Sequence, residues 1–283
     1  KTKEMFEAHL EQASTLKKMI EAVKGLVNHV NINCNEQGMS IQAIDTSHVA
    51  LVYLKLRTEG FALYNCEKSI SLGISMDHLS KILKSAANND TVIIRAEDEK
   101  DSLHIIFQPQ DEKRVSTFEL KLLDIDIPQL VIPVTEFTAN VTIASGEFQR
   151  ICRDLNALGE NVSLSANKEG MRFSVDGETA SGSVLLQPTD NVSDEESGAN
   201  TVVQIKTPVE QSFPLRYMLS FAKATPISDI VTFEMADDIP LAVTYPIEGQ
   251  GFVKYFLAPK IDGGSDDEGD EDEGDDEGDS MED

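Results

Sequence analysis

The sequence of 283 residues contains no tryptophan, and only 6% of its residues are aromatic. Stacking of single-stranded bases on aromatic side chains is therefore not indicated. No run of about 18 apolar residues occurs, so a membrane-spanning helix is not predicted. The three cysteines, Cys34, Cys66 and Cys152, have no metal-site spacing. We expect reduced, buried thiols, no metal and no cofactor.

Basic residues are also scarce, with 24 Lys and Arg against 50 Asp and Glu, a net charge of −26. Of the acidic residues, 14 lie between Asp262 and Asp283, where no Lys or Arg occurs. Because such a segment cannot bury a core, residues 262–283 are predicted to be a disordered acidic tail. The tail serves either as a solubilising segment or as a decoy for basic partners, including the chain's own basic face. On the second hypothesis it weakens the binding of other partners electrostatically.

The two halves of the chain resemble each other. At a shift of 132 residues Gly38 matches Gly170, and at a shift of 138 residues Phe118 matches Phe256. Two copies of one domain are therefore predicted. The predicted division is a first domain at 5–121, a connecting linker at 122–137, a second domain at 138–261 and the acidic tail at 262–283.

The pattern of apolar residues predicts an α+β fold dominated by antiparallel sheet, with two helices in each half. Segments rich in β-branched residues predict strands at 49–56, 91–97, 102–108, 116–122, 171–177, 181–187, 201–206, 230–236 and 241–247. Amphipathic segments predict helices at 14–27, 75–87, 145–158 and 214–225. The third helix is expected to be capped by the Ser145 side chain.

Each predicted helix carries basic residues away from its apolar stripe. In the third helix, Phe148, Ile151 and Leu155 form the stripe, whereas Arg150 and Arg153 lie on the other side. The basic residues placed in this way are Lys17, Lys18, Lys24, Lys81, Lys84, Arg150, Arg153, Arg216 and Lys223. One such helix is ordinarily a solvated surface, but four of them in an acidic chain indicate a polyanionic partner. Without a base-reading motif, contact with double-stranded DNA is expected to be independent of sequence.

Several long segments, in order along the chain, resemble the eukaryotic DNA sliding clamps of the proliferating cell nuclear antigen family. They are MFEAHL, IDTSHVALV, SGEFQRICRDL, LRYMLSFAKATP and YFLAPKI. The resemblance extends from Met5 to about Ile261. It implies a nuclear, non-enzymatic homotrimeric ring that encircles duplex DNA and acts as a processivity factor for DNA polymerase. It also implies that the clamp loader, flap nuclease and ligase dock through short peptides.

The size of the opening independently favours a trimer. Twelve helices at a spacing of about 9 to 10 Å form a circle about 36 Å across at their axes. Subtracting one helix diameter of about 10 Å leaves an opening of about 26 Å, enough for a duplex about 20 Å wide. Eight helices from a dimer leave only about 14 Å by the same estimate.

The resemblance further implies particular site residues. Partner peptides with a Gln, an aliphatic residue and two aromatics are expected in an apolar pocket beneath the linker, with backbone pairing along its last three positions. The matching positions are Ile44, His48, Val49, Leu130, Ile132, Pro240, Phe256, Ala258, Pro259 and Lys260. Phe118 is implied at one subunit edge, over Lys113–Lys121, and Thr179–Gln187 forms the other. Lys168 matches the ubiquitin-acceptor lysine.

Two other classes of function remain to be distinguished. An acidic-tail chaperone of basic, histone-like proteins requires the tail and is indifferent to the helix lysines, whereas a clamp requires the reverse. An enzyme finds little support, since Asp124 and Asp126 resemble a metal-binding pair but lie among apolar linker residues.

Overall fold

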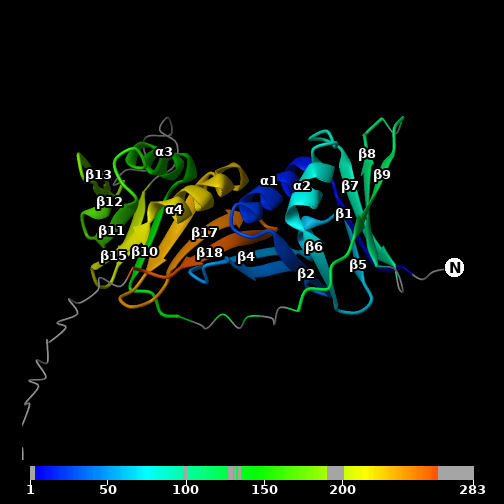
Figure 1. Ribbon diagram of the computed structural model, residues 1–283, viewed down its shortest axis with the longest axis horizontal. Helices are drawn as coiled ribbons and strands as arrows, with labels where there is room; N and C mark the ends of the chain where they lie inside the picture. Colours follow the sequence, from blue (N-terminus) through cyan, green and yellow to red (C-terminus); the bar gives the residue numbers. More distant parts are fainter. Residues whose placement is uncertain are drawn as a thin grey trace, which may run out of the picture.

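The computed structural model describes residues 4–97, 101–111, 113–126, 130, 132, 135–189 and 201–260. Within these ranges it is an α+β protein of antiparallel sheets with few helices (Figure 1). The predicted acidic tail at 262–283 lies outside the described residues, as do several linker positions. The α-helices and 3₁₀ helices are α1 (Ala13–Lys24), η1 (Thr58–Gly60), α2 (Met76–Leu83), α3 (Ser145–Leu155), α4 (Leu215–Phe221) and η2 (Ala222–Ile227).

Eighteen strands form three sheets in the described part of the chain. The five-stranded sheet runs β5 (Leu63–Cys66), β1 (Glu4–Leu10), β7 (Thr91–Glu97), β8 (Ser102–Gln108) and β9 (Ser116–Lys121). The nine-stranded sheet runs β14 (Val202–Ile205), β10 (Ala139–Ala144), β16 (Ile230–Met235), β17 (Leu241–Ile247), β18 (Gly251–Leu257), β4 (Ala50–Arg57), β3 (Gly38–Ile44), β2 (His29–Asn35) and β6 (Ile70–Ser75). The four-stranded sheet runs β13 (Ser181–Leu186), β12 (Gly170–Asp176), β11 (Asn161–Asn167) and β15 (Val209–Pro214). All nine predicted strands are present.

The strand order repeats between the two halves. Strands β1 to β9 of the first half pair with one another as β10 to β18 do in the second. Gly38 and Gly170 open equivalent strands with φ of +126° and +137°. A Cβ atom at either position lies about 2 Å from a backbone oxygen, that of Leu56 or of Leu186. Only glycine fits both the conformation and the space, so the two hairpins share one constraint.

A single joint connects the halves in the middle of the nine-stranded sheet. Strand β18 pairs with β4 over seven residues, from Gly251 opposite Leu56 to Leu257 opposite Ala50. In the repeat, β18 corresponds to β9 and β4 corresponds to β13. Strands β9 and β13 each end a sheet, and they lie at opposite ends of the molecule (Figure 1).

The strand register corrects one predicted match. Phe118 was matched with Phe256, but β9 pairs Phe118 with Ile105 whereas β18 pairs Tyr255 with Val243. Phe118 is therefore the equivalent of Tyr255. Both residues point toward the helix side, but Tyr255 is fully buried and Phe118 is only partly buried. The difference arises because β18 has β4 beside it, while no described strand pairs with the outer edge of β9.

The helices lie in a row along one side of the sheets, in the spatial order α3, α4, α1 and α2 (Figure 1). Their apolar stripes are buried against the sheets, as the spacing predicts. The buried stripe residues include Leu16, Met19, Ile20, Val23, Met76, Leu79, Leu83, Phe148, Ile151 and Leu155. At the joint, Phe221 of α4 stacks on Tyr255 with ring centroids 4.4 Å apart, and the Tyr255 hydroxyl donates to the Ala22 carbonyl of α1. The two halves thus share one core.

Three local predictions are wrong. Ser145 does not cap α3: it is the first helical residue, and its buried hydroxyl donates to the carbonyl of Ser228 instead. The fourth helix is α-helical only to Phe221, so Lys223 lies on the 3₁₀ segment η2. Cys66 is a free thiol but only partly buried.

The other two cysteines, Cys34 and Cys152, are free and buried as expected. Burial raises the pKa of both thiols well above their ordinary value. Such thiols stay protonated and unreactive at neutral pH.

Candidate functional sites on the two faces

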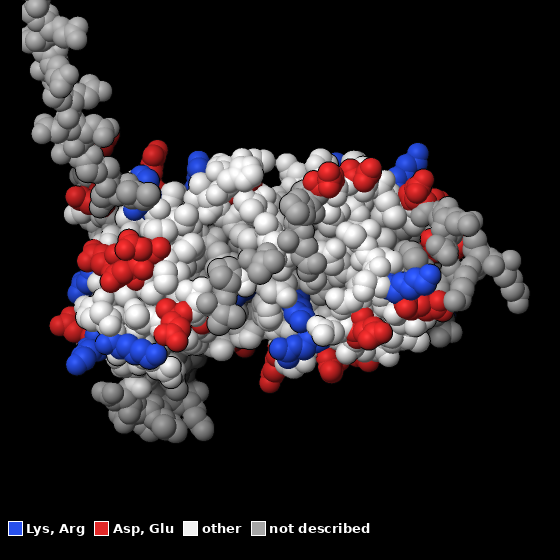
Figure 2. Space-filling model, turned by 90° about the horizontal axis from the view of Figure 1, so that it is seen from below, with Lys and Arg blue, Asp and Glu red and all other residues white. Residues whose placement is uncertain are grey.

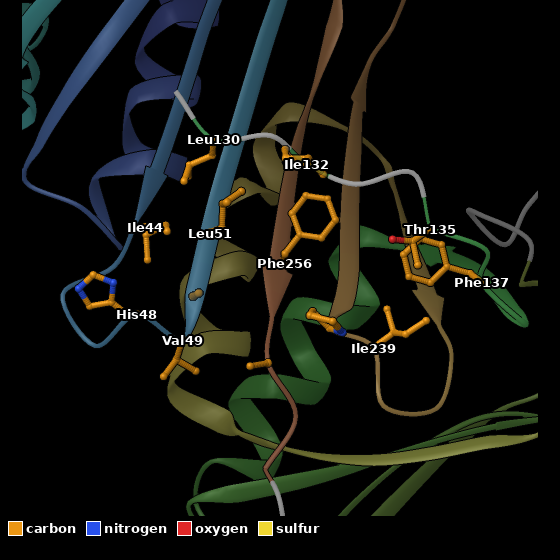
Figure 3. A pocket seen from close by; sticks show the side chains of 13 residues that line it. Ile44, His48, Val49, Leu51, Leu130, Ile132, Thr135, Phe137, Ile239 and Phe256 are labelled. Atoms are coloured by element: carbon orange, nitrogen blue, oxygen red, sulfur yellow. The ribbon is translucent and has the colours of Figure 1, made fainter. Parts of the chain in front are cut away.

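An apolar pocket lies on the sheet face that is turned away from the helices. Along β4 and β18, Val52 and Tyr255 face the helices, so their neighbours Leu51 and Phe256 face outward. The pocket has a volume of about 310 Å³. Figure 3 shows that Leu130 and Ile132 of the linker lie beside it, near Phe256. Between its charged side chains, this outer face has a central uncharged area (Figure 2).

Eight of the ten positions predicted for peptide docking line this one pocket. They are Ile44, His48, Val49, Leu130, Ile132, Pro240, Phe256 and Ala258. Pro259 and Lys260 do not line it. The prediction missed Ala50, Leu51, Thr135, Phe137 and Ile239. Alternation along β4 puts Leu51 on the face opposite to Val52, and only the register of β4 with β18 places it opposite Phe256.

The rim of the pocket is a turn organised by the Asp45 carboxylate. Asp45 is buried and accepts hydrogen bonds at 2.8 Å from the backbone amides of Val49 and Ala50, and at 3.2 Å from that of Ser47. The Tyr217 hydroxyl of α4 donates to it as well, at 2.8 Å. The turn holds His48 at a positive φ of 56°, with its side chain exposed.

These hydrogen bonds determine the charge of Asp45. Burial alone raises its pKa, but the hydrogen bonds from Ala50, Tyr217, Val49 and Ser47 together outweigh burial. The pKa of Asp45 therefore lies below its ordinary value, and the carboxylate is charged at neutral pH.

The aromatic wall of the pocket is backed by a fixed cation. The Lys254 ammonium lies 5.2 Å from the ring centre of Phe256 and 5.7 Å from that of Phe137. It also pairs with Glu234 at 2.7 Å. Lys254 thus attracts both rings through cation–π contacts, which favours a pocket wall that is already formed before a ligand binds.

Backbone pairing beyond the pocket is restricted. The amide of Ala258 donates to the Val49 carbonyl at 3.1 Å, and the amide of Lys260 donates to the Ser212 carbonyl at 2.8 Å. Pro259 has no amide hydrogen. A peptide lying along residues 258–260 therefore meets their carbonyl oxygens rather than their amides.

The helix side carries the predicted basic residues. Lys18, Lys81, Lys84, Arg150, Arg153, Arg216 and Lys223 are exposed, and Lys17 and Lys24 are partly exposed. The same segments carry four acidic residues, Glu21, Asp77, Glu147 and Asp154. Nine bases against four acids leave a net charge of +5 on a chain whose total is −26.

Some of these bases are already paired within the chain. Asp77 lies 2.7 Å from Lys81 and 3.5 Å from Lys24, and Glu147 lies 3.1 Å from Arg150. The hydrogen bond from Lys81 lowers the pKa of Asp77. Lys17 donates to the carbonyl of Ala86, in the turn after α2. In the described part of the chain, Lys18, Lys84, Arg153, Arg216 and Lys223 form no ion pair.

The remaining predicted positions belong neither to the pocket nor to the set of basic residues. Lys168 is exposed at the tip of the hairpin between β11 and β12, where Asn167 accepts from the amide of Glu169. Phe118 lies on β9, with its ring 5.5 Å from that of Phe107. Among the described residues, no group of three or more His, Cys, Asp or Glu side chains is arranged to hold a metal ion. None of the helices described is long and apolar enough to span a membrane.

A duplicated α+β chain with a basic row of helices on one side and an apolar pocket on the other is the subunit type of a ring-shaped DNA clamp. Comparison with known proteins agrees. The model of the proliferating cell nuclear antigen N-terminal domain matches residues 5–129, and that of the C-terminal domain matches residues 131–260. The proliferating cell nuclear antigen of Dictyostelium discoideum is 48% identical over 259 residues, which cover 91% of this chain and 100% of that relative. The chain belongs to the proliferating cell nuclear antigen family of DNA sliding clamps and processivity factors.

Proposed function

We propose that three copies of this chain close into a ring by repeating, between copies, the joint that each chain makes within itself. Inside one chain, β18 pairs with β4. Their repeat equivalents, β9 and β13, are the two sheet edges at opposite ends of the molecule. Pairing β9 of one copy with β13 of the next satisfies both edges and leaves neither open to aggregation. This internal joint is the observation that carries the proposal.

The same equivalence gives the contacts at the new joint. Tyr255 pairs with Val52, and the hairpin registers make Gly182 the equivalent of Val52. Phe118 of one copy then lies opposite Gly182 of the next. A glycine opposite a large aromatic leaves room for the ring to cover it. Phe118 becomes buried as Tyr255 is, so it serves as the trimer contact predicted from the sequence.

The ring places twelve helices around its opening. The exposed bases then face duplex DNA from all sides, at positions set by the sheets behind them. Contact is with the phosphates, independent of base sequence and sensitive to salt. The proposed DNA-contacting residues are Lys17, Lys18, Lys24, Lys81, Lys84, Arg150, Arg153, Arg216 and Lys223.

Retention on closed DNA tests the ring. The protein is loaded with a clamp loader onto circular duplex, and its release is followed before and after the circle is cut. We expect retention on the circle and rapid loss from free ends. Equal release from both, with a control clamp that loads normally, would contradict encirclement. The acidic-tail chaperone, which the family membership does not favour, would then have to be reconsidered.

We further propose that the pocket docks short peptides of DNA polymerase, clamp loader, flap nuclease and ligase. The chain acts in the nucleus without a catalytic step of its own. It works by raising the concentration of these enzymes at the DNA.

Lys168, exposed on its hairpin, is the proposed ubiquitin acceptor. The division at 5–121, 122–137, 138–261 and 262–283 is proposed to separate the two clamp domains from linker and tail.

Two matched substitutions in the linker test the pocket. Ile132→Ser removes an apolar side chain from the lining, whereas Leu123→Ser changes an exposed linker residue outside it. Burial of an isoleucine is worth about 1.5 to 3 kcal/mol, so peptide affinity should fall about tenfold or more in the first variant only. Titration calorimetry with a peptide carrying a Gln, an aliphatic residue and two aromatics measures it. Equal affinity in both variants would remove the linker from the site.

A further inference from the structure

The end of the described chain lies beside the basic helix face. Lys260 is fixed to β15 through its hydrogen bond to Ser212, and β15 leads directly into α4. Lys260 and Arg216, near the start of α4, line the same hollow. The turn that follows α3 forms its other wall, including Asn156 and Glu160. Lys260, the last described residue, therefore lies next to Arg216, and residues 262–283 follow it in the sequence.

Three exposed bases lie on α3, α4 and η2. These elements are in contact, since Gln149 of α3 donates to the Ala222 carbonyl of η2. Arg153 lies in the last turn of α3, Arg216 lies at the start of α4, and Lys223 lies on η2. All three are exposed and form no ion pair with any described residue. The hollow itself contains one acid, Glu160, against Arg216 and Lys260.

The remaining chain has the charge and the length to cover these bases. It carries 14 acidic residues and no Lys or Arg over residues 262–283. At about 3.3 to 3.6 Å per residue, an extended segment of this length reaches about 70 to 80 Å. A tethered segment faces its own chain at an effective concentration in the millimolar range. The tail is a chain of closely spaced negative charges, as DNA is. A surface that binds DNA independently of sequence recognises mainly this charge.

We propose that residues 262–283 bind back onto the helix face of their own chain at Arg153, Arg216 and Lys223, where they compete with the DNA phosphates. This inference rests on the proposed role of the helix face in DNA contact. The acidic segment occupies the face when DNA is absent and is displaced when DNA enters. Its effect is largest at low salt, because screening weakens the contact of the segment with the face.

Affinity for a short fluorescent duplex, measured by anisotropy between 50 and 300 mM salt, tests the competition. Three proteins are compared: the full chain, a chain lacking residues 262–283, and a full-length chain with its 14 tail acids changed to Asn or Gln. At 50 mM salt both altered chains should bind about tenfold more tightly than the full chain. At 300 mM salt the three should converge. The salt dependence of the altered chains should be steeper by about one unit for each phosphate contact regained.

Arg216→Ala locates the effect. In this background, removal of the tail should change affinity by only about two- to threefold. Lys206→Ala, an exposed base at the end of β14 and outside the helix row, should leave the tenfold effect intact. Equal affinities of full and tail-less chains at 50 mM salt would overturn the proposal. So would a tail effect that persists unchanged in Arg216→Ala.

A distance measurement tests the docked state directly. Spin labels are placed at Gly274→Cys in the tail and Asn156→Cys beside the hollow, in a Cys66→Ser chain whose other two thiols are buried. Rings containing one labelled chain should give a narrow distribution of distances at 50 mM salt, because a docked segment takes few conformations, whereas a free coil of this length, about 20 Å on average, gives a broad one. The distribution should broaden at 500 mM salt or on adding DNA. A distribution that neither condition changes would refute docking.

Failure of this inference is distinguishable from failure of the ring. If the tail-less chain is not retained on circular DNA, the proposed function fails whatever the tail does. If all three proteins are retained on circles but bind the duplex equally, only the docking of residues 262–283 is refuted.

Discussion

Removing one hydroxyl group, in Tyr217→Phe, tests how the pocket rim is held. The Tyr217 hydroxyl reaches from α4 to Asp45 at 2.8 Å, across 172 residues of sequence. A hydrogen bond to a charged, buried group contributes about 1.5 to 3 kcal/mol. At about 2 to 4 °C per kcal/mol for a chain of this size, we expect the melting midpoint to fall by about 3 to 12 °C. Calorimetry at one fixed protein concentration measures the change.

The matched control is Tyr53→Phe. Tyr53 packs edge-on against Phe252 at 5.1 Å, and no hydrogen bond of its hydroxyl occurs within the described part of the chain. Tyr53→Phe removes the same atom from a tyrosine on β4, so its midpoint should change little. Equal midpoints for the two variants would refute the argument that the hydroxyl holds the turn.

Acid adds a second measurement for Tyr217→Phe. The folded pKa of Asp45 is lowered, so its charge stabilises the fold above the unfolded pKa of about 3.9. That stabilisation is lost as the pH falls through the folded pKa. The deficit of Tyr217→Phe should therefore be complete at pH 7 and shrink below about pH 4. Peptide affinity should fall about three- to tenfold at pH 7, because His48 and Val49 lie on the loosened turn.

Three further predictions concern the repeat, the ring edge and the helix face. Gly170→Ala places a Cβ about 2 Å from the Leu186 carbonyl oxygen, so it should lower the free energy of unfolding in urea by more than about 2 kcal/mol. Gly146→Ala has open space around its Cβ and should instead raise that free energy by up to about 1 kcal/mol, because alanine favours α3. Phe118→Ala should shift rings toward single chains in sedimentation velocity, and an unchanged trimer would remove β9 from the joint. Arg153→Ala should weaken DNA binding equally for all sequences and lower the salt slope by about one unit, so a preference for one sequence would contradict phosphate contact.

Local patterns in the sequence predict the helices and about half of the strands, but not the remaining strands. The apolar stripes of the helices and the β-branched strands follow from side-chain spacing, because each element must bury one face. Strands such as β2 and β11 escaped prediction because Asn31, Asn33 and Ser163 have low strand propensity and are held by neighbouring strands. Whether such segments form strands depends on their pairing with neighbouring strands, which local sequence does not reveal.

The site residues also fall into those that local spacing predicts and those that it does not. The basic residues of the helix face could be identified from spacing, whereas most pocket positions came from the family resemblance. Residues such as Phe137 and Ile239 enter the pocket only because distant strands and the linker meet there. The bond between Asp45 and Tyr217 is invisible in the sequence for the same reason, since it depends on how the two halves are joined.

The joint between β4 and β18 also decides how such a ring can open. Of the six joints around the proposed ring, three lie within a chain, where the linker is a covalent tether between the two halves. If one of these breaks, the tether returns its edges to each other at high effective concentration, and the circle reseals. The three joints between β9 and β13 have no tether across them. A loader that passes DNA into the proposed ring is therefore expected to open one of the three joints between chains. Their positions follow from which strands pair within one chain.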